Sequence, residues 1–152
     1  MEFSYTKVLD FPRHQKRERT LPWVRVGLFN PRNPSKVIYT LGLVDSGADV
    51  SVVDREIGEE LTYKIEEGPK EQVVGLGGGI TNGFIHKVGF VIENPENPKD
   101  VVKYSDIVVF TKNTFPATMP QQTAIFGTIG FFRHLMVTFV YPRSIIIDTL
   151  AS

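Results

Sequence analysis

The chain has 152 residues, 17 basic and 17 acidic side chains, and no cysteine. This length favours one domain, residues 1–152, with enough mass for a buried core. The balanced charge gives no indication of a nucleic-acid surface, and the lack of cysteine excludes disulfides, thiolate catalysis and cysteine-based metal sites. No stretch reaches membrane-spanning length and residues 1–7 do not resemble a secretion signal, so we expect a cytoplasmic protein with no membrane partner.

Residues 1–20 are predicted to be an N-terminal extension or an edge strand. Residues 3–11 alternate loosely between apolar and polar side chains, which is typical of a strand. Residues 13–19 are basic. Because the rest of the chain is neutral, we interpret them as a solvated loop or strand edge rather than a nucleic-acid patch.

Two strand-turn-strand units share one turn pattern. Residues 23–29 and 37–44 are rich in β-branched and aromatic side chains and predict two strands around an Asn-Pro-Arg-Asn-Pro turn. Residues 87–93 and the segment from Val101 predict a second pair around Asn-Pro-Glu-Asn-Pro. Two copies are too few for a solenoid, and they favour a domain built from two similar β halves.

One acid, Asp45, lies between the apolar runs 41–44 and 50–53, which predict buried strands. A carboxylate at the end of a buried strand is costly unless it is paired, hydrogen-bonded or used in function. Ser46 supplies a short donor and acceptor beside it, and Gly47 lets the chain turn sharply. The plainer interpretation is an Asp-Ser-Gly turn with no chemical role.

A short helix and a glycine-rich hairpin are predicted next. Residues 54–61 begin with a possible cap, Asp54, although Gly58 weakens the helix. Residues 71–84 place four glycines around the apolar Leu76, which predicts a hairpin tip. No Gly-Lys-Ser/Thr follows, so this is not a phosphate loop. It is either a flexible surface hairpin or a lid that closes over a ligand.

The C-terminal third is predicted to hold one buried strand, one helix and two closing strands. Residues 123–127, Thr-Ala-Ile-Phe-Gly, predict a strand that ends in a turn without an acid. Residues 127–135 predict a short helix that presents Ile129 and Phe132 together. Residues 136–141 and 144–148 predict the closing strands.

The Asp-Ser-Gly-Ala turn at 45–48, the glycine-rich hairpin at 75–79 and the Ile-Phe-Gly turn at 125–127 resemble, in this order, the retropepsin-like aspartic proteases. The resemblance covers roughly residues 20–150. It implies an all-β closed barrel of two pseudo-symmetric halves, with a flap hairpin and one or two short helices. It also implies an aspartic endopeptidase that needs no cofactor or metal and acts on a peptide or protein substrate.

In such an enzyme two carboxyl groups hold one water. One carboxylate takes a proton from the water while the other, protonated, polarises the peptide carbonyl. This chain has only one Asp-Ser-Gly, because Asp148-Thr149-Leu150 lacks the glycine. A two-carboxyl site therefore requires a second Asp45 from a two-fold homodimer.

The resemblance assigns a role to each matching residue. Asp45 is catalytic, Ser46, Gly47, Ala48 and Asp49 support it, and Ser46 hydrogen-bonds across the two-fold axis. Substrate contacts are assigned to Val74, Gly75, Leu76, Gly77, Thr123 and Ile125. In viral members the position of Asp49 pairs with an arginine just after the second-half glycine, and here that arginine is replaced by Thr128.

The sequence offers little support for a metal site or a Ser-His-Asp site. His14, His86 and His134 share no metal-ligand spacing, so we expect surface or half-buried histidines and no metal. A Ser-His-Asp site around Ser51 lacks a nucleophile elbow. Two alternatives to the protease stay open. One is a retropepsin-like module that dimerises or binds peptides without cleaving them, and the other is an unrelated β-barrel binding protein in which Asp45 is structural.

Overall fold

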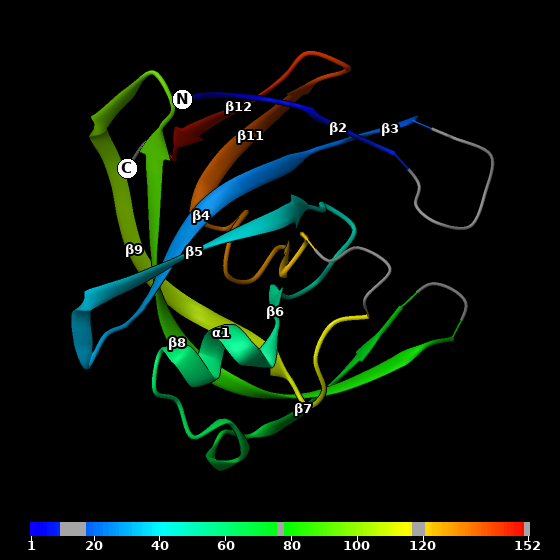
Figure 1. The fold of residues 1–152 in the computed structure, drawn as a ribbon, viewed down its shortest axis with the longest axis vertical. Helices are drawn as coiled ribbons and strands as arrows, with labels where there is room; N and C mark the ends of the chain where they lie inside the picture. The colour runs from blue at the N-terminus through cyan, green and yellow to red at the C-terminus, as the bar shows by residue number, and fades with distance from the viewer. Residues whose placement is uncertain (10–17, 76–77, 117–120, 151–152) are drawn as a thin grey trace.

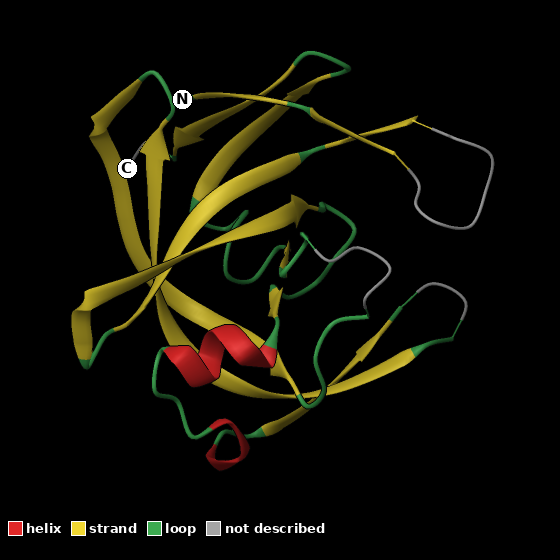
Figure 2. Cartoon of the chain, viewed as in Figure 1, coloured by secondary structure: helices red, strands yellow, loops and turns green. Residues whose placement is uncertain are grey.

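The computed structural model describes residues 1–9, 18–75, 78–116 and 121–150, which form an all-β protein with little helix (Figures 1 and 2). The strands are β1 (Glu2–Ser4), β2 (Thr6–Leu9), β3 (Glu18–Leu21), β4 (Trp23–Asn30), β5 (Asn33–Val44), β6 (Val52–Val53), β7 (Lys70–Val74), β8 (Ile80–Asn94), β9 (Asn97–Thr111), β10 (Ala124–Phe126), β11 (Leu135–Val140) and β12 (Ser144–Thr149). The helices are α1 (Arg55–Glu60) and a 3-10 turn, η1 (Ile65–Glu67). Neither is long and apolar enough to span a membrane.

The largest sheet closes on itself. Its strand order is β4-β5-β10-β6-β9-β8-β7, and β4 also pairs with β8, so six strands form a ring (Figure 1). In two places in the ring the adjacent strands run parallel: β5 beside β10, and β6 beside β9. Strands β1, β12 and β11 form a second sheet, and β2 and β3 form a third sheet of two strands.

The core fills the ring and continues under the second sheet. Its largest fully buried side chains include Phe90, Phe110, Phe126, Phe131, Leu28, Ile145 and Ile147. Burying a side chain of this size contributes about 2–3 kcal/mol. Glycines make room for these rings: a Cβ on Gly42 would lie 2.2 Å from the ring of Phe126, and one on Gly89 would lie 2.1 Å from the ring of Phe29.

The two predicted Asn-Pro turns fold in the same way. Asn30 accepts the N–H of Arg32 at 3.0 Å, and Asn94 accepts the N–H of Glu96 at 3.1 Å. Each turn has a register shift beside its first asparagine and closes on an Asn-Asn pair. The strands begin earlier after each turn than hydropathy predicts, because backbone pairing extends into polar residues that contribute nothing to the apolar pattern.

The predicted helix after Val53 is confirmed as α1. Asp54 caps it by accepting the N–H of Glu56 at 2.9 Å. Gly58, which lowers helix propensity, is buried because a Cβ there would lie 2.5 Å from Ile65. The predicted strands at 23–29, 37–44, 87–93, 136–141 and 144–148 are also present.

The helix predicted for residues 127–135 is wrong, since this segment is a series of turns before β11. Gly130 has φ of +96°, which lies outside the helical region. The N–H of Phe132 bonds to the carbonyl of Gly127, five residues back rather than four. At the N-terminus, the strand predicted for residues 3–11 is split into β1 and β2, and residues 10–17, with most of the basic segment, lie outside the described residues.

Thr62 ends helix α1 in a conformation that suits glycine. Its φ is +67°, its N–H bonds to the carbonyl of Glu59, and the N–H of Tyr63 bonds to the carbonyl of Gly58. This is a Schellman motif, in which the left-handed position is usually glycine or asparagine. Threonine is strained there, because its Cβ approaches the following carbonyl.

We therefore predict that Thr62→Gly raises the free energy of unfolding by about 0.5–1 kcal/mol. Thr62→Ala is the matched control. It removes the hydroxyl and methyl groups but keeps the Cβ, so its free energy of unfolding should rise little. Urea unfolding of the three proteins provides the comparison. Equal stabilisation by alanine and glycine would contradict a backbone origin.

Candidate active site

Asp45 lies where two parallel strands end together. β10 pairs with β5 so that Phe126 is opposite Val44, and the two chains leave the sheet at the same edge. The N–H of Asp45 donates to the carbonyl of Phe126 at 3.0 Å. The side chain of Asp45 is half-buried, and its carboxylate accepts the N–H of Gly47 at 2.9 Å. The predicted strand-end acid is therefore held in a tight turn with its carboxylate reachable from solvent.

A side chain at position 47 would crowd the carboxylate of Asp45, whereas the backbone of Gly47 is not left-handed. It is not among the described glycines with positive φ, which are Gly78 and Gly130. A Cβ on Gly47 would lie 3.2 Å from Oδ1 of Asp45, closer than most real contacts of that kind. Ser46 and Gly47 are both exposed, so the turn presents Asp45, a hydroxyl and bare backbone on one surface.

The 127–130 turn is bonded to the Asp45 turn through the backbone. Thr128 donates to the carbonyl of Ala48 at 2.8 Å, and Ile129 donates to that of Asp49 at 2.9 Å. Gly127 fits because a Cβ there would lie 2.6 Å from the carbonyl oxygen of Ala48. Thr128, which the sequence resemblance matched to an arginine of viral members, thus meets the Asp45 turn by a main-chain bond.

Ser51 makes further hydrogen bonds to the 127–130 turn. Its N–H donates to the carbonyl of Ile129 at 2.8 Å, and its hydroxyl oxygen accepts the N–H of Gly127 at 3.0 Å. The residue is buried and bonded into the fold. Its role is structural, in agreement with the rejection of a Ser-His-Asp site.

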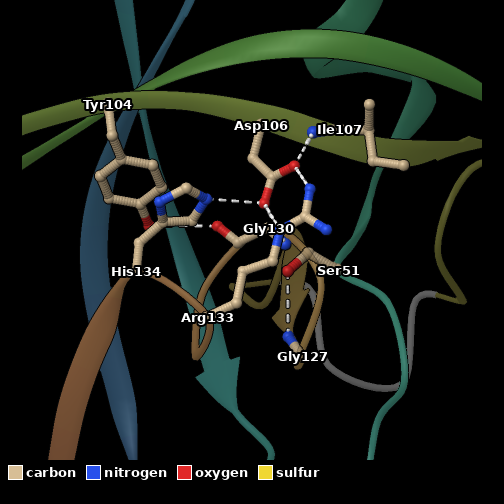
Figure 3. A network of polar contacts seen from close by, with 8 residues as sticks. All are labelled: Ser51, Tyr104, Asp106, Ile107, Gly127, Gly130, Arg133 and His134. Atoms are coloured by element: carbon tan, nitrogen blue, oxygen red, sulfur yellow. Dashed lines mark hydrogen bonds and ion pairs between the residues drawn. The ribbon is translucent and has the colours of Figure 1, made fainter. Parts of the chain in front are cut away.

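A buried carboxylate, Asp106, is hydrogen-bonded to the 127–130 turn from the side away from Gly127 (Figure 3). Its side chain is 3% exposed and accepts the N–H of Gly130 at 3.0 Å and that of Ile107 at 2.7 Å. It also pairs with the guanidinium of Arg133 and with Nε2 of His134, the latter at 2.8 Å.

Tyr104 closes this cluster. Its ring stacks on His134 with centroids 4.4 Å apart, and its hydroxyl donates to the carbonyl of Gly130 at 3.1 Å (Figure 3). Sequence reasoning missed the Asp106 cluster, although a signal was present. Asp106 directly precedes the apolar run 107–110, and a carboxylate beside a buried apolar run is costly unless it is paired or hydrogen-bonded.

The pKa of Asp106 lies below its ordinary value of 3.8. Burial alone raises this pKa, but hydrogen bonds from Arg133, Ile107, His134 and Gly130 favour the charged form and outweigh burial. Asp106 is therefore ionised at neutral pH and stabilises the folded state there.

A cleft of about 600 Å³ lies under the base of the β7–β8 hairpin. It is lined by Val52, Val73, Gly75, Gly79, Ile80, Thr81, Asn82, Thr111, Asn113, Thr114, Phe115, Pro116, Gln122 and Ile125. The size suits a small ligand or one or two side chains of a peptide. A second cavity of about 590 Å³, between the β4–β5 turn and η1, has a more polar lining and contains none of the predicted site residues.

The cleft contains only some of the predicted substrate-contact residues. Gly75 and Ile125 line it, and Leu76 and Gly77 lie outside the described residues. Val74 is 68% exposed and is not among the lining residues. Thr123 is not among them either, because its hydroxyl pairs with that of Thr40.

Asp45 is adjacent to the cleft rather than in its lining. Ile125, which lines the cleft, is opposite Leu43, two residues before Asp45. Asp54 fixes another wall, since its carboxylate accepts the N–H of Phe115 at 2.7 Å while it also caps α1. The chain therefore places a carboxylate and a cleft with apolar lining residues at neighbouring positions.

The described histidines have protein partners. Nε2 of His86 contacts the carbonyl oxygen of Ile65 at 2.8 Å, and His134 is bonded to Asp106. Among the described residues, no group of three His, Asp or Glu side chains is arranged to hold a metal ion. His14 lies outside these residues.

Comparison with known proteins finds neither a family model nor a curated protein that matches the chain. The functional argument therefore depends on the residues and their geometry.

We predict that Asp106→Asn lowers the free energy of unfolding by about 2 kcal/mol at neutral pH, because it removes a buried hydrogen-bonded charge. The loss should shrink as pH falls through the lowered pKa of Asp106, where the parent protein also loses the charge. Asp100→Asn, the same change in the exposed part of β9, is the control and should cost less than about 0.5 kcal/mol. Denaturant unfolding between pH 7 and pH 3 measures both. A loss that stays constant down to pH 3 would contradict the assignment.

Proposed function

We propose that the protein is a retropepsin-like aspartic endopeptidase that works as a homodimer, with one Asp45 from each copy. The observation that carries this proposal is the Asp45 turn: a half-buried carboxylate at the paired ends of β5 and β10, followed by exposed Ser46 and Gly47. A shared catalytic site requires such an open surface, because the second carboxylate has to approach from outside the chain.

The strand pairing supports the two-half architecture of this family. The ring has an internal two-fold symmetry in which β4 corresponds to β8, β5 to β9 and β6 to β10: when these labels are exchanged, the strand order of the ring is reversed and every pairing within it is kept. The parallel pair β5–β10 then becomes the parallel pair β9–β6, and the pairs β10–β6 and β4–β8 each become themselves. The matching Asn-Pro turns fall on equivalent hairpins.

This exchange changes one detail of the sequence interpretation. β10 corresponds to β6, so the Ile-Phe-Gly turn is the counterpart of the chain around Asp54 rather than of the Asp45 turn. The counterpart of the Asp45 turn is the segment that follows β9, and residues 112–121 contain no acid. The second half of the chain therefore does not repeat the catalytic carboxylate, which agrees with a dyad assembled from two copies.

The proposed mechanism uses one water and two carboxyl groups. Two carboxylates about 3 Å apart cannot both ionise, so the pair of Asp45 side chains shares one proton. The ionised Asp45 takes a proton from the water as the water oxygen bonds to the peptide carbonyl carbon, and the neutral Asp45 donates its proton to the carbonyl oxygen, which gives a diol. The Asp45 that took the water proton then passes it to the amide nitrogen, and the C–N bond breaks. A hydroxyl of the diol returns its proton to the other Asp45, and the products are a carboxylic acid and an amine.

The cleft suits an extended peptide with an apolar side chain. Val52, Phe115 and Ile125 supply apolar surface on one side, and Ile80, which is 58% exposed, supplies it from the hairpin. Burial of a peptide side chain here would be favoured by the hydrophobic effect. Because Asp45 lies outside the cleft lining, a peptide-binding module without catalysis is the second candidate function.

We predict that Asp45→Asn abolishes peptide cleavage and leaves the fold and peptide binding nearly intact. Asparagine fills the same space and still accepts the N–H of Gly47, but it cannot act as a general base. Cleavage of a fluorogenic peptide library and binding of an uncleaved peptide should be measured on the same preparations.

Asp148→Asn is the matched control, because Asp148 is also an aspartate followed by a hydroxyl residue, Thr149, and is exposed on β12. It should keep its activity. Cleavage by Asp45→Asn above a trace would overturn the aspartic mechanism. Peptide binding without cleavage by the unaltered protein would favour the non-catalytic module.

A further inference from the structure

The β2–β3 ribbon, residues 6–9 and 18–21, pairs only with itself in the described part of the chain. Thr6 is opposite Leu21 and Leu9 is opposite Glu18, and neither strand has a third neighbour. An isolated two-stranded ribbon is marginally stable in water. The proposed function gives this ribbon no role, and the sequence predicts only an N-terminal extension or an edge strand there.

The root of the ribbon lies beside the Asp45 turn. Pro22, the residue after β3, accepts the N–H of Val44 at 3.0 Å, and Trp23 is opposite Leu43. In Figure 1 the ribbon projects from the side of the molecule on which β5 ends and the β7–β8 hairpin opens. At its other root, Tyr5 donates its N–H to the carbonyl of Arg143 at 3.2 Å.

The two faces of the ribbon differ in exposure. Opposite residues in an antiparallel pair share a face, so Thr6, Val8, Arg19 and Leu21 share one, and these four are half-buried. The other face carries Lys7 and Glu18, which are exposed and form an ion pair at 3.6 Å. The exposed pair contributes little to stability, so the half-buried face is the one suited to packing against a partner.

An exposed aromatic residue stands beside the root. The ring of Tyr141 contacts that of Tyr5 edge-on, with centroids 5.6 Å apart, yet Tyr141 is 71% exposed. Tyrosine is enriched in protein interfaces, where its ring buries area and its hydroxyl keeps a polar partner.

We propose that the β2–β3 ribbon is a dimerisation arm that packs against a second copy of this chain. The inference rests on the proposed function, which puts the two-fold axis between the two Asp45 side chains. Two carboxyls about 3 Å apart bring the second copy against the surface around Asp45. Four residue pairs extend the ribbon by about 13 Å from a root that is bonded to the residue before Asp45, so a ribbon on this side meets the partner.

Symmetry makes the arm effective. In a two-fold dimer each arm reaches the other copy, so every contact occurs twice. The arm also gives a physical reason why the dimer can form without an arginine at position 128, because the second contact region lies outside the Asp45 turn.

The test shortens the arm without disturbing its root. Replacing residues 8–19 by Asn-Gly joins Lys7 to Thr20 through a two-residue hairpin turn and keeps the pairs Thr6–Leu21 and Lys7–Thr20. Sedimentation velocity over a dilution series measures the dimer dissociation constant. We expect it to rise at least about tenfold, as for loss of one hot-spot contact, while the melting temperature of the monomer stays close to that of the parent chain.

The control exchanges the exposed charges, Lys7→Glu together with Glu18→Lys, which preserves the ion pair and the net charge. Its dissociation constant should stay within about twofold of the parent value. Val8→Asp, a point change on the half-buried face, should weaken the dimer in the same direction as the shortened arm.

The outcomes separate the two proposals. If the unaltered protein dimerises and cleaves peptides but shortening the ribbon leaves the dissociation constant unchanged, the ribbon has no role in dimerisation. The proposal of a shared Asp45 site is then unaffected. If the unaltered protein stays monomeric at every concentration, both are overturned. If the shortened protein dimerises weakly and recovers cleavage at high concentration, the arm and the shared site are both supported.

Discussion

The backbone contact between the Asp45 turn and the 127–130 turn is the constraint on which the rest of the structure depends. Two parallel strands end side by side, and the chains that leave them are joined by hydrogen bonds of 2.8–2.9 Å from Thr128 and Ile129 to Ala48 and Asp49. Main-chain bonds of this kind fix position without using the side chain of Asp45. The carboxylate is therefore held in place while its outer side stays open.

Other unusual features of the chain follow from this contact. Gly127 has no side chain because the carbonyl of Ala48 occupies that space. Gly130 takes a left-handed conformation that lets its N–H point at buried Asp106. Arg133 balances the charge of Asp106 and His134 is hydrogen-bonded to it, since a buried carboxylate without partners would be too costly. A short run of residues thus connects the outer turn to the core.

Much of the fold could be predicted from sequence because its signals are local. Alternating or continuous apolar runs indicated most of the strands, Asp54 indicated the start of α1, and the Asn-Pro repeats indicated two similar halves. The helix expected after Phe126 failed because the local apolar spacing was outweighed by tertiary bonds to residues 48–51. Hydropathy does not contain that information.

The candidate site was predictable only in part, for the same reason. Asp45 could be found because an isolated acid between apolar runs is visible in one stretch of sequence. Asp106, Arg133 and Tyr104 act through contacts across the chain, so no short pattern joins them. Thr123 was assigned to substrate contact by resemblance. In the structure its hydroxyl is hydrogen-bonded to that of Thr40 on β5, and it is not among the residues that line the cleft.

The central claim is that each active site contains Asp45 from two chains, and mixing tests it most directly. Unaltered protein and Asp45→Asn are combined in equal amounts, allowed to exchange subunits, and assayed for peptide cleavage. A shared dyad predicts that activity per unaltered chain falls to about one half, and to about one tenth with a ninefold excess of the variant, because mixed dimers are inactive. Activity per unaltered chain that stays constant at every ratio, with exchange verified by mass spectrometry, would contradict the shared site.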